Sequence, residues 1–258
     1  FIQAPPFEAV ATSRPGVFAA GAAAGPKDIP ESVTEASAAA AAAGTVAAQS
    51  RGTQLAAPFF PEERDIKGEP PRVGVFVCHC GINIGGTVDV PEVVKYASTL
   101  PFVAYNEQNL FTCSQDTQKL ISEKINEYQL NRVVVASCTP RTHEPLFRAT
   151  LREAGLNPYM FEMANIREHC SWVHMTEPQE ATQKAKELVR MAVARTVDFE
   201  PLEDIQLPVT RSALVIGGGA AGMTAALALG DQGFPVTLVE RDQHLGGNLR
   251  HIHYTLQG

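Results

Sequence analysis

Residues 73–80 read Val-Gly-Val-Phe-Val-Cys-His-Cys, an apolar run of strand length that ends in two cysteines. Its first part, 73–78, is the first of four predicted strands, and the others are 102–106, 132–137 and 158–163. A stretch with helical periodicity follows each run, at 90–99, 114–128, 144–154 and 177–197. Such alternation is typical of a parallel α/β sheet. We therefore predict a Rossmann-like α/β domain over residues 72–198, whose last helix begins with a capping box of Thr176 and Gln179.

A cysteine follows each of the four predicted strands: Cys80, Cys113, Cys138 and Cys170. Parallel strands end at one edge of their sheet, so these thiols can converge on a common site. Four thiolates suit a 4Fe-4S cluster or a zinc ion, and the cysteines alone do not distinguish the two. Cys78 lies inside the apolar run and is expected to be a spare, buried thiol. The alternative is that all of them are unrelated core thiols.

A second motif lies in residues 213–222, which read Ala-Leu-Val-Ile-Gly-Gly-Gly-Ala-Ala-Gly. Gly217, Gly219 and Gly222 form a G-x-G-x-x-G pattern between an apolar strand and a helix, which indicates a dinucleotide site. The helix start at Ala220 and Ala221 directs N–H groups at the pyrophosphate. Glu240 ends the next strand, where it is expected to accept a hydrogen bond from a ribose hydroxyl. The alternative is a glycine turn needed only for packing.

The N-terminal residues 1–50 hold a turn at 13–16, an apolar segment at 17–20 and an alanine-rich segment. We predict a short buried strand at 17–20 and a helix from Pro30 to Ala48, since proline is favoured in a first helical turn. Residues 51–71 are polar and rich in proline, which is typical of a linker.

Both ends of the sequence resemble flavoproteins. Val239-Glu240-Arg241 with Leu245-Gly246-Gly247 resembles the thioredoxin-reductase-like family. The resemblance implies FAD rather than NAD, bound near Glu240, Arg241 and Gly247. Gly16-Val17-Phe18-Ala19-Ala20-Gly21 resembles the late strand of the same fold, which implies that Gly21, Lys27 and Asp28 lie close to the flavin.

Three residues near the segment 16–21 bear on the predicted flavin site, and two of them leave alternatives open. Ala22 stands where many family members carry aspartate, so a contact to the ribityl chain is in doubt. A cation at Lys27 would favour the reduced flavin anion. Asp28 could lie close to the flavin, or it could instead cap the helix that follows it.

The two flavoprotein segments occur in the reverse of their usual order. We therefore predict that residues 1–50 end one FAD-binding domain and that 199–258 begin a second FAD/NAD(P)-binding domain. The sequence would then be part of a longer, duplicated chain. A circular permutation is the alternative.

Four cysteine-bearing motifs together resemble the family of heterodisulfide reductase A subunits: Val-Gly-Val-Phe-Val-Cys-His-Cys-Gly-Ile-Asn-Ile, Asn-Leu-Phe-Thr-Cys-Ser-Gln-Asp-Thr-Gln, Val-Val-Val-Ala-Ser-Cys-Thr-Pro-Arg and Asn-Ile-Arg-Glu-His-Cys-Ser-Trp-Val-His. Gly25-Pro26-Lys27-Asp28-Ile29-Pro30 looks like the end of that family's flavoprotein domain. The resemblance implies an oxidoreductase with FAD and a 4Fe-4S cluster rather than zinc. The family's C-x-x-C-x-x-C inserts are absent from the sequence.

The same resemblance implies partners: other heterodisulfide reductase-type subunits and an electron donor such as a hydrogenase, ferredoxin or dehydrogenase. It leaves open whether flavin-based bifurcation occurs. Two other functions remain, a nucleotide-binding module with a structural zinc and a pyridine-nucleotide disulfide oxidoreductase. The missing C-x-x-C pair counts against the second.

Composition narrows the class of protein further. A net charge of -7 excludes an electrostatic basis for nucleic-acid binding. The alanine-rich stretch 36–48 is too short and too weakly apolar to predict a membrane span. Five scattered cysteines favour reduced thiols and a cytoplasmic location.

Polar residues near the cysteines offer further ligands or charges. His79, His143, His169 and His174 could bind a metal or be ordinary loop side chains. Arg141, Arg148 and Arg167 could neutralise a thiolate cluster or be solvated surface charges.

Overall fold

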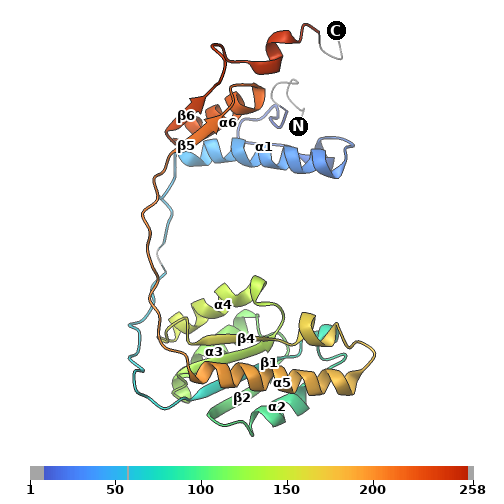
Figure 1. Cartoon of the computed structure of the whole chain (residues 1–258), viewed down its shortest axis with the longest axis vertical. Coiled ribbons are helices and arrows are strands. Elements are labelled where there is room, and N and C mark those ends of the chain that lie inside the picture. The colour runs from blue at the N-terminus through green and yellow to red at the C-terminus, as the bar shows by residue number, and fades with distance from the viewer. Residues whose placement is uncertain (1–8, 57, 255–258) are drawn as a thin grey trace. The chain divides into compact units, whose positions relative to one another are not determined.

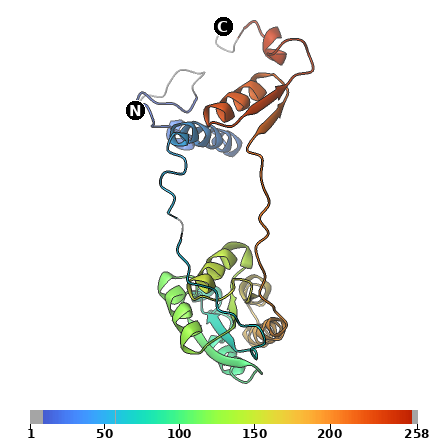
Figure 2. The ribbon, with the colours of Figure 1, turned by 90° about the vertical axis from the view of Figure 1, so that its left-hand side faces the viewer.

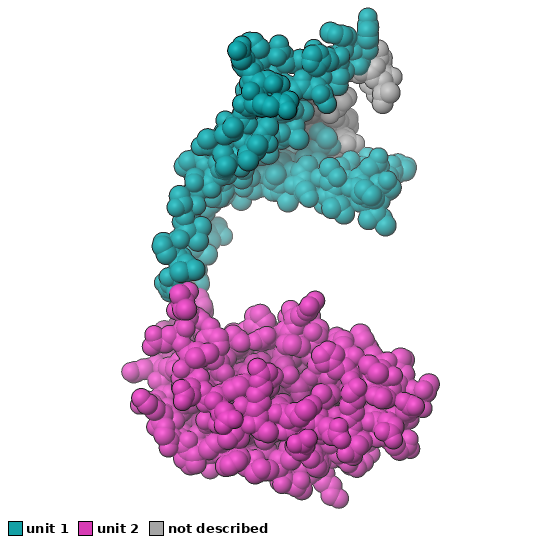
Figure 3. All heavy atoms as spheres, viewed as in Figure 1, with its two compact units in different colours: residues 1–57, 206–258 teal, residues 58–205 magenta. Residues whose placement is uncertain are grey.

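The computed structural model describes residues 9–56 and 58–254, which fall into two compact units (Figure 3). Unit 1 combines residues 1–57 with 206–258, and unit 2 comprises residues 58–205. Each unit has its own sheet.

Unit 2 is built on a four-stranded parallel sheet in the order β2-β1-β3-β4 (Figures 1 and 2). Its strands are β1 (Val73–Cys78), β2 (Val103–Asn109), β3 (Arg132–Ser137) and β4 (Phe161–Asn165). All three strand pairings are parallel, so the four carboxyl ends share one edge. The predicted α/β fold with a parallel sheet is confirmed.

Helices cover both faces of this sheet. They are α2 (Val90–Ala97), α3 (Gln115–Glu127), α4 (Pro140–Glu153) and α5 (Pro178–Val197). One apolar cluster joins α2 and α5 to the sheet, and a second joins α3 and α4 to the opposite face. Alternate residues of β1 belong to different clusters. Val75 and Val77 pack in the cluster with α2 and α5, and Phe76 packs in the cluster with α3 and α4. The continuous apolar run is therefore explained by burial on both faces.

Most predicted element positions agree with the structure, and β1 and β3 match to the residue. Strand β4 starts three residues later than predicted, because residues 157–160 form a turn. In this turn the Asn157 carbonyl accepts a hydrogen bond from the Met160 N–H at 3.1 Å. Helix α4 begins at Pro140 rather than at residue 144, with the Thr139 hydroxyl accepting from the Arg141 N–H.

The predicted capping box before α5 is wrong. The N-cap residue is Glu177, and its side chain makes no capping hydrogen bond. Pro178 occupies the first helical position, where the missing N–H costs no intrahelical hydrogen bond.

Unit 1 is smaller and has a two-stranded parallel sheet of β5 (Ala213–Ile216) and β6 (Val236–Val239). Its helices are α1 (Ile29–Ala48) and α6 (Ala220–Asp231), with 3-10 turns η1 (Gly21–Ala24) and η4 (Gly247–His251). Helices α1 and α6 are in contact. Beyond the end of α1, the guanidinium of Arg51 lies 4.6 Å from the ring centre of Phe234.

The segment 17–20, predicted as a short buried strand, is neither a strand nor fully buried. Only an isolated antiparallel bridge joins Phe18 to Ala11, so the apolar residues lack a sheet to extend. The predicted assignment of the two ends to successive flavoprotein domains stays a prediction, although the structure groups both ends in unit 1.

No helix in the described part of the chain combines the length and apolarity that crossing a bilayer would require.

Candidate functional site

The glycine-rich turn of unit 1 joins β5 to α6 in the manner of a dinucleotide site. Gly217 has φ of 106°, which favours glycine, and Gly219 is the N-cap of α6. No side chain caps this helix start, and the first N–H groups of a helix have no intrahelical partner. The N–H groups of Ala220 and Ala221 belong to this uncapped start, and their predicted role in binding a pyrophosphate stays a prediction.

Steric space distinguishes the glycines of this turn. A Cβ atom on Gly222 would lie 1.8 Å from the Gly217 carbonyl oxygen, so a larger residue would force the turn away from the helix. A Cβ atom on Gly219 would meet no atom within 4 Å among the described residues, which leaves room for a ligand. The Cα atom of Gly219 lies 3.2 Å from where a Cβ of Gly247 would be, so Gly247 borders this turn.

Glu240 supports the turn from the end of β6. Its carboxylate accepts hydrogen bonds from the N–H groups of Gly218, at 2.6 Å, and Asp242, at 2.9 Å. These two bonds lower the pKa of Glu240, with the larger contribution from the Asp242 bond, and so favour the ionised carboxylate. A carboxylate has further lone pairs with which to accept from a ribose hydroxyl. Arg241 beside it is almost fully exposed.

The predicted flavin contacts Gly21, Lys27 and Asp28 lie at the start of α1 in unit 1. Lys27 forms an ion pair with Glu35, with Nζ 2.5 Å from Oε2, and the Gly21 N–H donates to the same oxygen at 2.9 Å. The cation at Lys27 is thus neutralised within the protein. Asp28 is the N-cap of α1 and forms a capping box with Glu31, so the structure supports the capping alternative for its carboxylate.

The thiols of unit 2 lie where the parallel strands end. Cys80 follows β1, and its N–H donates to the Leu110 carbonyl in the loop after β2. Cys113 is exposed in that loop, and Cys138 is buried after β3. Burial raises the pKa of Cys138, while the positive charge of Arg167 opposes the increase. Cys113 is also near enough to contribute to this pKa.

Cys78, which the sequence suggested to be a spare, buried thiol, is buried at the end of β1, two residues before Cys80. The Thr112 N–H points at its sulfur at 3.4 Å. Burial raises its pKa, and both Cys80 and Cys138 are close enough for electrostatic interaction with it. The Cys-x-Cys spacing at the end of the first strand was the only sequence signal for this arrangement.

Cys170 is placed differently from the other predicted ligands. It lies in a π-helical turn, η3 (Arg167–Ser171), and packs in the apolar cluster beneath α5. Its thiol donates to the Ala181 carbonyl at 3.0 Å, and burial raises its pKa to about 11. The structure therefore places Cys170 in the apolar cluster that also contains Cys78, and its predicted role as a metal ligand stays a prediction.

The arrangement of the thiols decides which kind of metal group they could hold. Within residues 9–56 and 58–254, no three His, Cys, Asp or Glu side chains converge as ligands of one ion. In a 4Fe-4S cluster each thiolate binds a different iron, so the thiols surround the cluster instead of meeting at one atom. Cys78, Cys80, Cys113 and Cys138 lie at or just after the carboxyl ends of three adjacent strands, which is compatible with an arrangement around a cluster.

Two of the four histidines near these loops, His79 and His174, have side-chain contacts that do not involve a cysteine. His174 pairs with Glu177, its Nδ1 lying 3.0 Å from Oε2. His79 packs against Gly85, where an added Cβ would overlap the imidazole ring.

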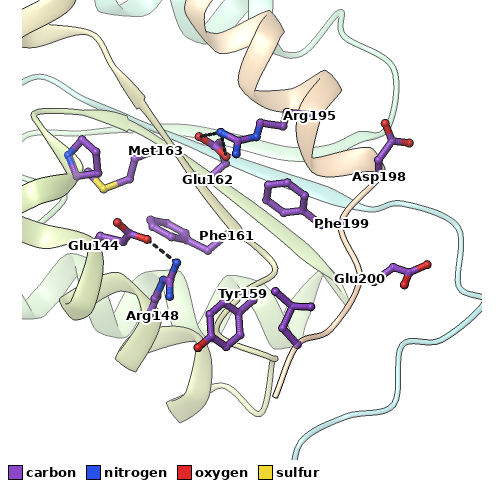
Figure 4. A pocket seen from close by; sticks show the side chains of 12 residues that line it. Glu144, Arg148, Tyr159, Phe161, Glu162, Met163, Arg195, Asp198, Phe199 and Glu200 are labelled. Carbon is purple, nitrogen blue, oxygen red and sulfur yellow. Dashed lines mark hydrogen bonds and ion pairs between the residues drawn. The ribbon is translucent and has the colours of Figure 1, made fainter. Parts of the chain in front are cut away.

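A groove elsewhere on unit 2 has a volume of about 640 Å³ (Figure 4). It borders the edge strand β4, and its charged side chains pair with one another, Glu144 with Arg148 and Glu162 with Arg195. No cysteine is among its described lining residues. The cavity therefore does not contain the thiol group.

Comparison with known proteins finds one family model and several relatives of this chain. The NAD(P)-binding Rossmann-like domain family matches residues 215–258. The iron-sulfur A subunit, form 2, of the CoB-CoM heterodisulfide reductase of Methanopyrus kandleri is 57% identical over 187 residues, 72% of this chain and 28% of its own length. The A subunit of the H(2):CoB-CoM heterodisulfide,ferredoxin reductase of Methanothermobacter marburgensis is 52% identical over 75% of this chain and 29% of its own length.

A third relative agrees with these two. The A subunit of the ferredoxin/F(420)H(2)-dependent CoB-CoM heterodisulfide reductase of Methanosarcina acetivorans is 48% identical over 69% of this chain and 22% of its own length. The chain thus spans less than a third of the length of these relatives. Identity of this level over most of the chain confirms the resemblance seen in the cysteine motifs, and the chain belongs to the family of heterodisulfide reductase A subunits.

Proposed function

We propose that this chain contributes an iron-sulfur centre and part of a flavin site to an oxidoreductase of the heterodisulfide reductase type. The observation that carries the proposal is the gathering of four thiols and a cation, Arg167, at the carboxyl edge of a parallel sheet. When bound, FAD and a 4Fe-4S cluster would supply electron uptake and release in steps of one or two electrons. The protein holds them in place and tunes their potentials.

For the cluster we propose four ligands: Cys80, Cys113 and Cys138, as predicted from the sequence, and Cys78. Cys78 replaces Cys170, which the sequence predicted as the fourth ligand. Cys78 lies in electrostatic reach of Cys80 and Cys138. Cys170 donates its thiol to the Ala181 carbonyl at 3.0 Å, whereas the sulfur of Cys78 lies 3.9 Å from the Leu110 carbonyl. Because a metal binds the thiolate, iron would reverse the preference for the neutral thiol that burial gives to Cys78 and Cys138.

For the nucleotide we propose FAD, with its pyrophosphate at the start of α6 and its ribose near Glu240. The open space at Gly219 and the uncapped helix support an approaching phosphate. The choice of FAD over NAD(P) rests on the flavoprotein-like sequence around Glu240 and Gly247.

For partners we propose further heterodisulfide reductase-type subunits and an electron-donor protein. The names of two relatives mention ferredoxin, hydrogen or F420H2 as reaction partners of those proteins. The edge that carries the thiols also exposes large apolar side chains from three loops, which suits contact with another protein. These residues are Ile82, Leu110, Phe111, Trp172, Val173 and Met175.

Anaerobic reconstitution with iron and sulfide tests the cluster. We expect a brown protein with broad visible absorbance, an electron paramagnetic resonance signal on reduction, and equal amounts of bound iron and sulfide. A colourless protein that binds zinc stoichiometrically would contradict the proposal and would support a structural metal.

Single cysteine variants identify the ligands. Cys78→Ala, Cys80→Ala, Cys113→Ala and Cys138→Ala should each lose most of the bound iron. Cys170→Ala is the matched control for Cys78→Ala and Cys138→Ala, since it also removes a buried thiol, and it should keep the iron. The opposite result for Cys78 and Cys170 would restore the ligand set predicted from the sequence.

FAD binding is tested separately, by gel filtration of the 258-residue chain after incubation with FAD. We expect little flavin to co-elute, because the described part of the site is shallow and partly exposed. Stoichiometric retention would contradict this expectation and would strengthen the choice of FAD.

A further inference from the structure

Arg167 is the charged side chain in closest contact with the thiol group. It is the first residue of η3 and is separated from β4 by Ile166 alone. Its Nη1 lies 3.8 Å from the sulfur of Cys80, which is within the range of a hydrogen bond to sulfur. Its charge also acts on Cys138, which ends the neighbouring strand. One guanidinium thus reaches two proposed ligands from different strands.

Three contacts fix this guanidinium in place. The Trp172 ring lies below it, with the ring centre 4.8 Å from Cζ, a geometry that attracts a cation. Glu168 accepts from Nε at 3.1 Å and from Nη2 at 2.7 Å. The backbone is held by the buried Asn165, whose side-chain oxygen accepts from the N–H groups of Arg167 and Glu168. Nη1 is left facing the sulfur.

We propose that Arg167 raises the reduction potential of the iron-sulfur site and that Glu168 partly offsets it. This inference rests on the proposed cluster. A cluster gains negative charge when it is reduced, so a nearby fixed cation stabilises the reduced form. Glu168 has the opposite effect, because its second oxygen, Oε2, is buried and has no hydrogen-bond partner among the described residues. The potential therefore depends on a balance between two adjacent residues.

Arg148 provides a matched comparison. It also forms an ion pair with a neighbouring glutamate, Glu144, and it also lies over an aromatic ring, that of Tyr159, at 4.6 Å. It lines the groove beside β4, and its charge is not among the influences on the pKa of Cys138. A change at this pair removes the same charges without touching the thiols.

The experiment is a redox titration of the reconstituted full chain, followed by electron paramagnetic resonance, with iron and sulfide measured for every variant. Arg167→Met should keep the cluster and lower the equilibrium constant for its reduction about tenfold, which is 59 mV for one electron. Glu168→Gln should shift the potential in the opposite direction. Arg167→Lys, which retains the charge, should lie closer to the wild type than Arg167→Met. Arg148→Met and Glu144→Gln should leave the potential unchanged.

The outcomes separate this inference from the proposed function. A wild-type chain without iron and sulfide overturns both. A wild-type cluster with unchanged potentials in Arg167→Met and Glu168→Gln, or shifts of the same sign in both, overturns only the role of Arg167. If Arg167→Met fails to assemble a cluster, the other two variants test the proposal. An increase in the potential of Glu168→Gln, with a near wild-type potential for Arg167→Lys, supports the proposal. No increase in the potential of Glu168→Gln overturns it.

Discussion

The two units use the same strand-turn-helix pattern, but they bury their residues very differently. In unit 2 every residue of β1 and β3 is buried, and helices cover both faces of the sheet. In unit 1 the strands alternate between half-buried and exposed residues, and α1 and α6 contain no buried residue. Leu214 and Ile216 of β5 are 63% and 80% exposed.

Because of this difference, we expect substitutions to affect mainly stability in unit 2 and mainly ligand binding in unit 1. Unit 2 has a core of its own, so its thiols are held by a rigid edge. Unit 1 offers the local geometry of a nucleotide site with little packing behind it. The same kind of substitution should therefore have different consequences in the two units.

The largest expected effect is on the core of unit 2. Phe147 is 1% exposed and stacks on Phe161 at 5.6 Å between ring centres. Phe147→Ala should lower the free energy of unfolding of unit 2 by about 3–5 kcal/mol. Leu238→Ala in β6 should cost unit 1 only about 1 kcal/mol, because Leu238 is incompletely buried. Hydrogen exchange measured by mass spectrometry reads both units in one experiment.

Phe147→Leu is the control for this comparison, since it keeps an apolar side chain and should cost less than about 1.5 kcal/mol. Equal protection of peptides from the two units in the wild-type chain would break the comparison.

An intermediate effect is expected at the glycine turn of unit 1. Gly219→Ala adds a methyl group into open space, so stability should be unchanged while dinucleotide affinity falls about tenfold, or about 1.4 kcal/mol. Gly222→Ala should disturb the turn itself, because of the overlap with the Gly217 carbonyl. Calorimetric titration with FAD gives the affinity, and hydrogen exchange of residues 213–231 gives local stability. Loss of protection in Gly219→Ala would show that the space is structural.

The smallest effects are in pH dependence, and they have opposite signs in the two units. Hydrogen bonds from Lys27 and Gly21 lower the pKa of Glu35 from its ordinary value of 4.5. The stabilisation of unit 1 by Glu35 is therefore complete above pH 4.5 and is lost as the pH falls through the lower, folded value. Glu35→Gln should flatten the acid side of the stability curve.

In unit 2, burial raises the pKa of Glu162, and Arg195 only partly opposes the increase. The folded state therefore favours the neutral acid, and stability decreases as the pH rises from 4.5 through the folded value. Glu162→Gln should remove this decrease. Thermal unfolding across acidic and neutral pH measures both variants, and changes of the same sign would contradict the assignment.

The sequence predicted the elements whose pattern is local. The apolar runs of β1 and β3 and the glycine turn were positioned correctly because burial on both faces and backbone sterics leave direct traces in composition. Strand β4 was shifted because Asn157 is held in its turn partly by distant residues, Glu63 and Leu202. Such contacts leave no periodic signal.

The thiol group was only partly predictable for a related reason. The order of cysteines and strands predicted the correct edge, but not which way each sulfur faces. The π-helical turn directs Cys170 towards Ala181, while Cys78, at the last position of β1, lies against the loop after β2. Likewise, nothing in the sequence distinguished Arg167 from Arg148 before their neighbours were known.

The backbone of Cys80 has a further consequence. With φ of 47° and ψ of 36°, it adopts the left-handed conformation, which costs an ordinary residue about 1–2 kcal/mol and a glycine almost nothing. Glycine at this position would therefore relieve conformational strain and leave the domain more stable. A cysteine here sacrifices stability to present its sulfur beside the guanidinium of Arg167, which is how a site optimised for chemistry differs from one optimised for folding.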